Sequence, residues 1–207
     1  GPAQWRRIAL AAGILAALAA APASGAGPVR SLIEMRHDRV VIQQFDLSCG
    51  AAALTTILRY QHGDMITERD VALGLIGQDA YLENPLLVRA RHGFSLGDLK
   101  RFVEDRGYKA TGLGRLEIDD LVERAPMIVP IASYGYNHFV VFRGRYGNRV
   151  LLADPAFGNR TMTVDRFQRA WLDYGNFGKV GFVVERPGAV QGPGLLAPHP
   201  DDFVTLR

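Results

Sequence analysis

One cysteine stands where its thiol could act as a nucleophile. Cys49 is the single cysteine among 207 residues. Apolar side chains recur after it at the helical period, at Ala53, Leu54, Ile57 and Leu58, and this pattern predicts a helix that begins at Cys49. A thiol at a helix N-terminus faces unpaired amides and the positive end of the helix dipole, which lowers its pKa and favours the reactive thiolate. The alternative is a small, buried hydrophobic residue with no chemical role.

A histidine and an aspartate follow at the ends of two predicted strands. His138 opens the apolar run 138–142, so its ring would stand at a strand end as a general base. Asp154 directly follows the run 149–153, and a glycine-containing turn would join the two strands as a hairpin. The hairpin would place Asp154 beside His138, where its carboxylate accepts the second ring N–H and fixes the tautomer. Considered one at a time, each residue has an alternative interpretation. His138 could be a hydrogen-bonded histidine at a sheet edge, and Asp154 could be an ordinary turn-forming aspartate before proline.

A side-chain amide lies shortly before the candidate nucleophile. Gln43 could donate hydrogen bonds together with the backbone N–H of Cys49, and two such donors form an oxyanion hole for a tetrahedral intermediate. By itself Gln43 is weak evidence, because most glutamines are exposed to solvent. The order Gln43, Cys49, His138 and Asp154 is nevertheless that of papain-like cysteine peptidases.

The elements that must hold these residues fall into two groups along the chain. In the first group, capping-box patterns at Thr67–Asp70 and Ser95–Asp98 predict helices that continue to residues 76 and 106. A shorter amphipathic helix is predicted over 118–125, and a short strand over 40–42.

The second group is predicted to be mainly strands. They cover 127–131, 138–142, 149–153 and 180–185, with one helix over 164–172. Helices followed by an antiparallel sheet predict an α+β fold in which two halves pack together and leave a cleft. The nucleophile from the helical half and the base from the sheet half would meet there.

Composition and charge are those of one compact globular domain with an appendage. The chain is 48% hydrophobic and 22% charged, and its formal net charge is +3. From residue 27 onward, 22 basic residues oppose 21 acidic ones, which leaves +1. Basic and acidic residues are interspersed along the chain, and this excludes the continuous basic surface that binds nucleic acid. No cluster of cysteine and histidine has the spacing of metal ligands, so we expect no metal and no other cofactor.

The first 26 residues have the pattern of a secretory signal peptide. Arg6 and Arg7 precede an apolar run, and small residues follow it up to Ala26. A membrane anchor is the alternative, although the apolar run is shorter than the roughly 20 residues that a spanning helix needs.

Three segments resemble the motifs of a known family. They are 43–52 (Gln-Gln-Phe-Asp-Leu-Ser-Cys-Gly-Ala-Ala), 138–141 (His-Phe-Val-Val) and 154–158 (Asp-Pro-Ala-Phe-Gly). Together they resemble peptidase family C39, the bacteriocin-processing, double-glycine leader peptidases. The resemblance covers 38–186 and implies a papain-like fold for that domain.

The same resemblance implies roles for individual residues. Cys49 would be the nucleophile, His138 the base, Asp154 the residue that orients it, and Gln43 the oxyanion-hole donor. Cleavage would follow small residues, at Gly-Gly or Gly-Ala sites. The chain departs from the family at Ser48, where an aspartate is usual.

The expected organisation is a signal peptide or anchor over 1–26, a lead-in over 27–37, the peptidase domain over 38–186 and a tail over 187–207. Residues 187–200 are expected to be poorly ordered, because glycine and proline are frequent there.

The sequence shows no transporter motif beside the peptidase domain. In this it resembles the exported, periplasmic C39-like proteins of secretion or functional-amyloid (Fap-type) systems. Its partner would then be a peptide or protein substrate of such a system, with membrane association possible through the N-terminal segment. A silent C39-like binding module is the alternative function, and hydrolysis, acyl transfer and the oligomeric state stay open.

Overall fold

The computed structural model describes residues 30–78, 83–84, 93–188 and 192–206. Its first helices are α1 (Leu32–His37), α2 (Cys49–Thr56), the π-helical turn η1 (Ile57–Gln61) that continues α2, α3 (Glu68–Ile76) and α6 (Leu96–Glu104). Its strands are β1 (Lys109–Leu113), β2 (Met127–Ser133), β3 (Tyr136–Tyr146), β4 (Arg149–Asp154), β5 (Gly158–Thr163) and β6 (Gly181–Glu185). Further short helices are α7 (Ile118–Arg124), α8 (Val164–Ala170), η2 (Gly175–Phe177) and α9 (Asp202–Thr205). Among the helices of these described ranges, we find none with the length and apolar character to cross a membrane.

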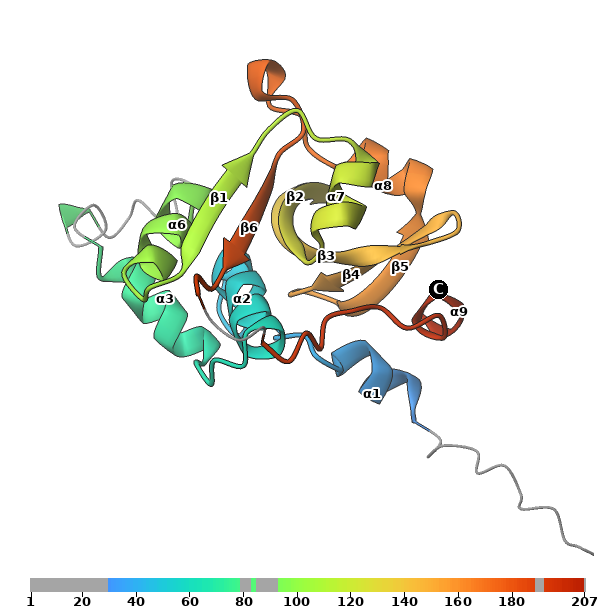
Figure 1. Ribbon diagram of the computed structural model, residues 1–207, viewed down its shortest axis with the longest axis horizontal. Helices are drawn as coiled ribbons and strands as arrows, with labels where there is room; N and C mark the ends of the chain where they lie inside the picture. The colour runs from blue at the N-terminus through green and yellow to red at the C-terminus, as the bar shows by residue number, and fades with distance from the viewer. Residues whose placement is uncertain (1–29, 79–82, 85–92, 189–191, 207) are drawn as a thin grey trace, which may run out of the picture.

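The strands form one antiparallel sheet in the order β1-β6-β2-β3-β4-β5. Figure 1 shows α2, α3 and α6 gathered beside one part of the sheet, and α7 and α8 beside another. The predicted α+β arrangement, with a helical half followed by a sheet half, is confirmed.

Two hydrophobic cores lie on opposite faces of the sheet, because side chains alternate along β2 and β3. Ile128 and Val141 belong to the core formed with α2, α3 and α6. Their neighbours Val129 and Val140 belong to the second core, which contains Phe167 of α8. The central strands are thus buried on both faces and form a rigid support for the ends of β3 and β4.

The start signals of the two capped helices are confirmed. The Ser95 hydroxyl accepts from the Asp98 amide at 3.2 Å, and the Asp98 carboxylate accepts from the Ser95 amide at 2.8 Å. Thr67 and Asp70 form the same reciprocal pair at the start of α3. These caps satisfy amide groups that have no partner inside the helix, so each helix begins at the predicted residue.

The strand predicted over 40–42 is wrong. This segment is irregular, because its backbone amides form hydrogen bonds outside the sheet. The Val41 amide donates to the hydroxyl of Thr56 at 3.0 Å. Just after the segment, the Gln43 amide donates to the carbonyl of Pro155 at 2.9 Å. Val40 is buried in the first core. An apolar run therefore signalled burial here, but not strand pairing.

The tail also differs from its prediction, because residues 192–206 pack against the domain. Leu196 is buried in the first core, and its carbonyl accepts from the Arg143 guanidinium at 2.9 Å. The carbonyl of Leu206 accepts from both the amide and the hydroxyl of Thr161, at 2.9 and 2.8 Å. These contacts tie the tail to β3 and β5.

Two adjacent leucines test whether the tail is part of the fold. Leu196 is fully buried, whereas Leu195 exposes 42% of its surface. We expect Leu196→Ala to lower the free energy of unfolding by about 2–5 kcal/mol through lost burial and a residual cavity. Leu195→Ala should change it by less than about 0.5 kcal/mol. Chemical denaturation of both variants would decide, and equal small effects would show that the tail does not contribute to the core.

Candidate active site

Cys49 is the first residue of α2, as predicted, and its thiol is largely buried. It exposes 9% of its surface and lines a cavity of about 970 Å³. Burial raises the pKa of the Cys49 thiol, and this outweighs hydrogen bonds from the Phe139 and Gly50 amides, which act to lower it. The expectation of a lowered thiol pKa is therefore corrected, because desolvation of the anion exceeds the effect of the helix terminus.

His138 lies at the start of β3 and lines the same cavity as Cys49. Its side chain is 2% exposed, and Nε2 lies 3.3 and 3.2 Å from the two carboxylate oxygens of Asp154. The other nitrogen, Nδ1, is buried and has no hydrogen-bond partner among the residues that the structure describes. When Nε2 carries the proton that bonds Asp154, Nδ1 of the neutral ring has a free lone pair. The ring is thus arranged to accept a proton from a group in the cavity.

Asp154 ends β4 and is fully buried. Besides the contact with His138, its carboxylate accepts from the Ala156 amide at 2.9 Å and forms an ion pair with the Arg160 guanidinium, 2.7 Å away. Burial acts to raise the pKa of Asp154, but the hydrogen bond and charge of His138, the charge of Arg160 and the Ala156 amide lower it overall. The Asp154 side chain is therefore an anion held in fixed orientation.

Gln43 stands on the loop between α1 and α2, where it contacts the β4–β5 turn. Its amide N–H donates to the carbonyl of Pro155, the residue after Asp154, at 2.9 Å. Its side-chain amide donates to the carbonyl of Phe45 at 3.4 Å, within the same loop. The backbone contact brings Gln43 to the site. Its side chain would have to turn from Phe45 to act as an oxyanion donor.

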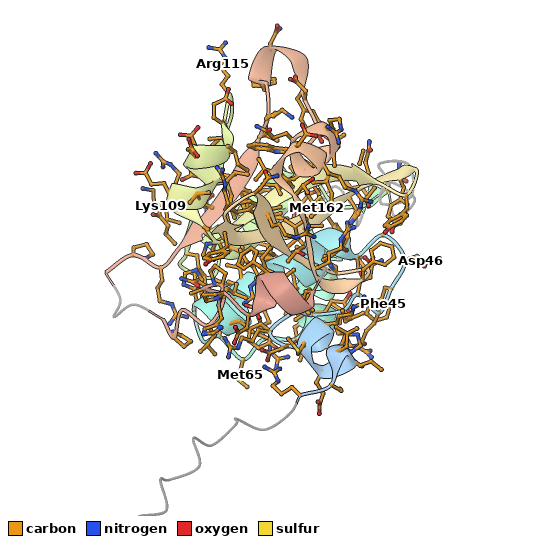
Figure 2. The ribbon with its side chains drawn as sticks, turned by 90° about the vertical axis from the view of Figure 1, so that its right-hand side faces the viewer. Phe45, Asp46, Met65, Lys109, Arg115 and Met162 are labelled. Carbon is orange, nitrogen blue, oxygen red and sulfur yellow. The ribbon has the colours of Figure 1, made fainter. Side chains whose placement is uncertain are left out.

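Glu68 is a residue of this site that sequence reasoning missed. It is 4% exposed, and its carboxylate accepts from the Gln44 amide at 3.1 and 3.2 Å and from the Ser48 hydroxyl at 2.5 Å. These bonds hold both ends of the segment between Gln43 and Cys49. Phe45 and Asp46, between the two ends, lie at the surface (Figure 2). In the sequence, Glu68 is only the residue after a helix cap, and no local pattern indicates its partners.

The cavity opens between the two halves of the fold. Gly93 to Leu96 contribute from the start of α6, and Tyr136 to Phe139 contribute from β3. Leu172, Tyr174 and Phe177, around η2, add apolar surface. Three exposed glycines, at positions 112, 114 and 135, leave backbone accessible along the walls. A cleft with exposed backbone and apolar side chains suits an extended peptide.

Comparison with known proteins places this site in a family. Residues 37–175, more than half of the chain, match the sequence model of the Peptidase C39 family. The "Probable functional amyloid protease FapD" of Pseudomonas aeruginosa is 36% identical over 171 residues, which are 82% of this chain and 70% of that protein. The protein of the same name from Pseudomonas fluorescens is 37% identical over 147 residues, 69% of this chain and 61% of the relative, so the match spans less than two thirds of its length.

Two solved structures share the fold. One is a double glycine motif protease from an AMS/PCAT transporter in complex with the leader peptide, with a TM-score of 0.55 and 23% identity over 71% of this chain and 90% of the other. The second is the peptidase domain of Streptococcus ComA, a bi-functional ABC transporter, with a TM-score of 0.55 and 16% identity over 72% and 98% of the two chains. The papain-like fold expected from the sequence is confirmed.

Replacing the buried Glu68 carboxylate tests how firmly the loop before Cys49 is held. Glu68→Gln removes the negative charge that strengthens both hydrogen bonds and puts an amide N–H₂, itself a donor, against the Gln44 amide. We expect a loss of about 1–3 kcal/mol in the free energy of unfolding. Glu104→Gln, which removes only an exposed pair with Lys100, is the matched control and should change it by less than about 1 kcal/mol. Equal effects in denaturant titrations would contradict a holding role for Glu68.

Proposed function

This chain belongs to the peptidase C39 family and is a cysteine peptidase, and we propose that it cleaves exported peptides through a Cys49–His138–Asp154 triad. The observation that carries the proposal is the buried, unpartnered Nδ1 of His138, in a ring whose Nε2 bonds Asp154 and which shares its cavity with Cys49. This arrangement supplies a nucleophile, a base and an orienting carboxylate in one cleft.

The first half of the proposed reaction forms an acyl-enzyme. The Cys49 thiol gives its proton to Nδ1 of His138, and the sulfur attacks the peptide carbonyl carbon. Asp154 stabilises the positive ring through Nε2. The ring then protonates the leaving amine, the C–N bond breaks, and the thioester with Cys49 remains.

The second half releases the acid. Neutral His138 takes a proton from water, the hydroxide adds to the thioester carbonyl, and the C–S bond breaks with return of the proton to sulfur. In both halves the carbonyl oxygen becomes negative. The Cys49 amide, at the start of α2, and the side chain of Gln43 are the proposed donors to it.

Small residues are proposed on the acyl side of the cut, at Gly-Gly or Gly-Ala sites. The family membership supports this preference, as does the glycine-rich wall of the cavity, where a substrate backbone can approach the protein backbone. The preference would appear as a lower kcat/KM when either residue before the cut is enlarged.

The proposed setting is the periplasm, and the proposed substrate is a component of a functional-amyloid or other secretion system. The signal-like pattern of the first 26 residues supports export, with removal of the segment or anchoring through it as the two routes. The name shared by two relatives, functional amyloid protease, supports the substrate class.

The triad is tested with candidate exported substrates that carry a Gly-Gly or Gly-Ala site. We expect Cys49→Ala and His138→Ala each to lower kcat/KM by at least about 10³-fold, because neither acylation nor proton transfer remains. Asp154→Asn should lower kcat with little change in KM, since it affects the orientation of the ring but not substrate contact. Product analysis by mass spectrometry gives the cut site. Equal cleavage by wild type and Cys49→Ala would remove the triad, and binding without cleavage by wild type would favour a silent binding module.

Gln43 and its neighbour form a matched pair for testing the oxyanion hole. Gln43→Ala should lower kcat by about 10²-fold, because one donor to the developing oxyanion is lost. Gln44→Ala removes a similar side chain but keeps the backbone amide that Glu68 binds, so its kcat should stay within about twofold of wild type. Steady-state kinetics on one peptide compares the two, and equal losses would show that Gln43 acts only through the loop.

A further inference from the structure

Arg160 lies behind the proposed triad and touches its carboxylate. It is in β5, paired with Leu152 of β4, and its guanidinium lies 2.7 Å from Asp154. Asp154 is fully buried, and Arg160 exposes only 16% of its side chain. This ion pair is therefore shielded from solvent and is stronger than one at the surface.

The Arg160 guanidinium is held on several sides. It donates to the Ser133 hydroxyl at 3.2 Å, and its carbon lies 5.7 Å from the Tyr134 ring centre and 5.4 Å from that of Phe157. The two rings are themselves in contact, with centres 5.0 Å apart. Cation–π contacts with both rings keep the guanidinium directed at Asp154.

One carboxylate thus serves two cationic partners. Asp154 meets the permanent charge of Arg160 and also the ring that becomes positive when Cys49 ionises. Part of its negative charge is neutralised before His138 gains a proton. The imidazolium is therefore less stabilised than it would be beside an unshared carboxylate.

We propose that Arg160 is a positioning residue that fixes Asp154 toward His138 and, by sharing its charge, keeps the resting triad as neutral thiol and imidazole. The proposal rests on the proposed triad and adds a residue that does not touch the substrate.

The groups that face His138 come from every element packed around it. Asp154 and Arg160 lie behind the ring on β4 and β5, Tyr136 of β3 has its ring centre 5.0 Å away, and Cys49 of α2 lines the same cavity. Of these, Arg160 is the permanent cation. Its removal is the cleanest way to alter the charge that the ring experiences.

Alkylation of the thiol tests the proposal without any substrate. Cys49 is the single cysteine, so the pH dependence of the reaction with iodoacetamide reports the ionisation of this one thiol. We expect Arg160→Gln to move the acid limb of the pH–rate profile down by about one unit, because an unshared Asp154 favours the thiolate–imidazolium pair. Arg160→Lys keeps the charge and should restore the wild-type limb. Arg149→Gln, which loses bonds to Thr161 on the same sheet, should leave the limb in place.

The proposal would be overturned if the acid limb of the pH–rate profile in folded Arg160→Gln stayed in place or moved to higher pH. If that variant does not fold, Phe157→Leu is the second test, because it removes one of the two exposed rings over the guanidinium. We expect its acid limb of the pH–rate profile to move to lower pH. An unchanged acid limb in this variant would contradict the proposal. Peptide cleavage gives the second readout: Arg160→Gln should lower kcat by up to about 10²-fold at unchanged KM. If the wild-type protein cleaves no peptide but the acid limb of the alkylation profile still moves in Arg160→Gln, the proposed hydrolysis fails. The proposed effect of Arg160 on Asp154 and the thiol would then still hold.

Discussion

The buried hydrogen bond between His138 and Asp154 is the interaction on which the site depends. A carboxylate without solvent contact is stable only when donors or cations surround it, and Asp154 has hydrogen bonds with the ring of His138 and the amide of Ala156 and an ion pair with the guanidinium of Arg160. These donors come from β3, the β4–β5 turn and β5. The register of three strands is therefore constrained by one side chain, and a slip of any of them would leave a buried charge without its partner.

The helical half is joined to this sheet site by the loop that ends at Cys49. Gln43 bonds to the carbonyl of Pro155 next to Asp154, whereas Glu68 of α3 holds Gln44 and Ser48. One short segment thus receives its position from both halves of the fold. Cys49, the proposed nucleophile, is placed by contacts from both halves of the fold, which fix the start of its helix against β3.

The sequence alone predicted the position of those residues that lie where a local pattern marks the start or end of a helix or strand. The helix start at Cys49 and the strand end at Asp154 were found where predicted, whereas β3 begins at Tyr136, two residues before His138. Arg160 was missed because β5 is rich in polar residues and does not have the apolar pattern of a strand, since those polar side chains bond buried groups. The partners of Glu68 are distant in sequence, and the effect of burial on the thiol depends on tertiary packing. Neither is visible in local periodicity.

Two features of the fold act on the thiol in the same direction. Burial of Cys49 raises its pKa, and the sharing of Asp154 with Arg160 weakens the counter-charge that an ionised triad would need. In the proposed mechanism, the reactive anion is then formed by proton transfer to His138 as the substrate is attacked. Because oxidation of cysteine follows thiolate character and exposure, a neutral thiol with 9% exposure is protected while the enzyme is idle. For the single cysteine of a cysteine peptidase, this protection is a physical reason to keep the proposed nucleophile buried and neutral.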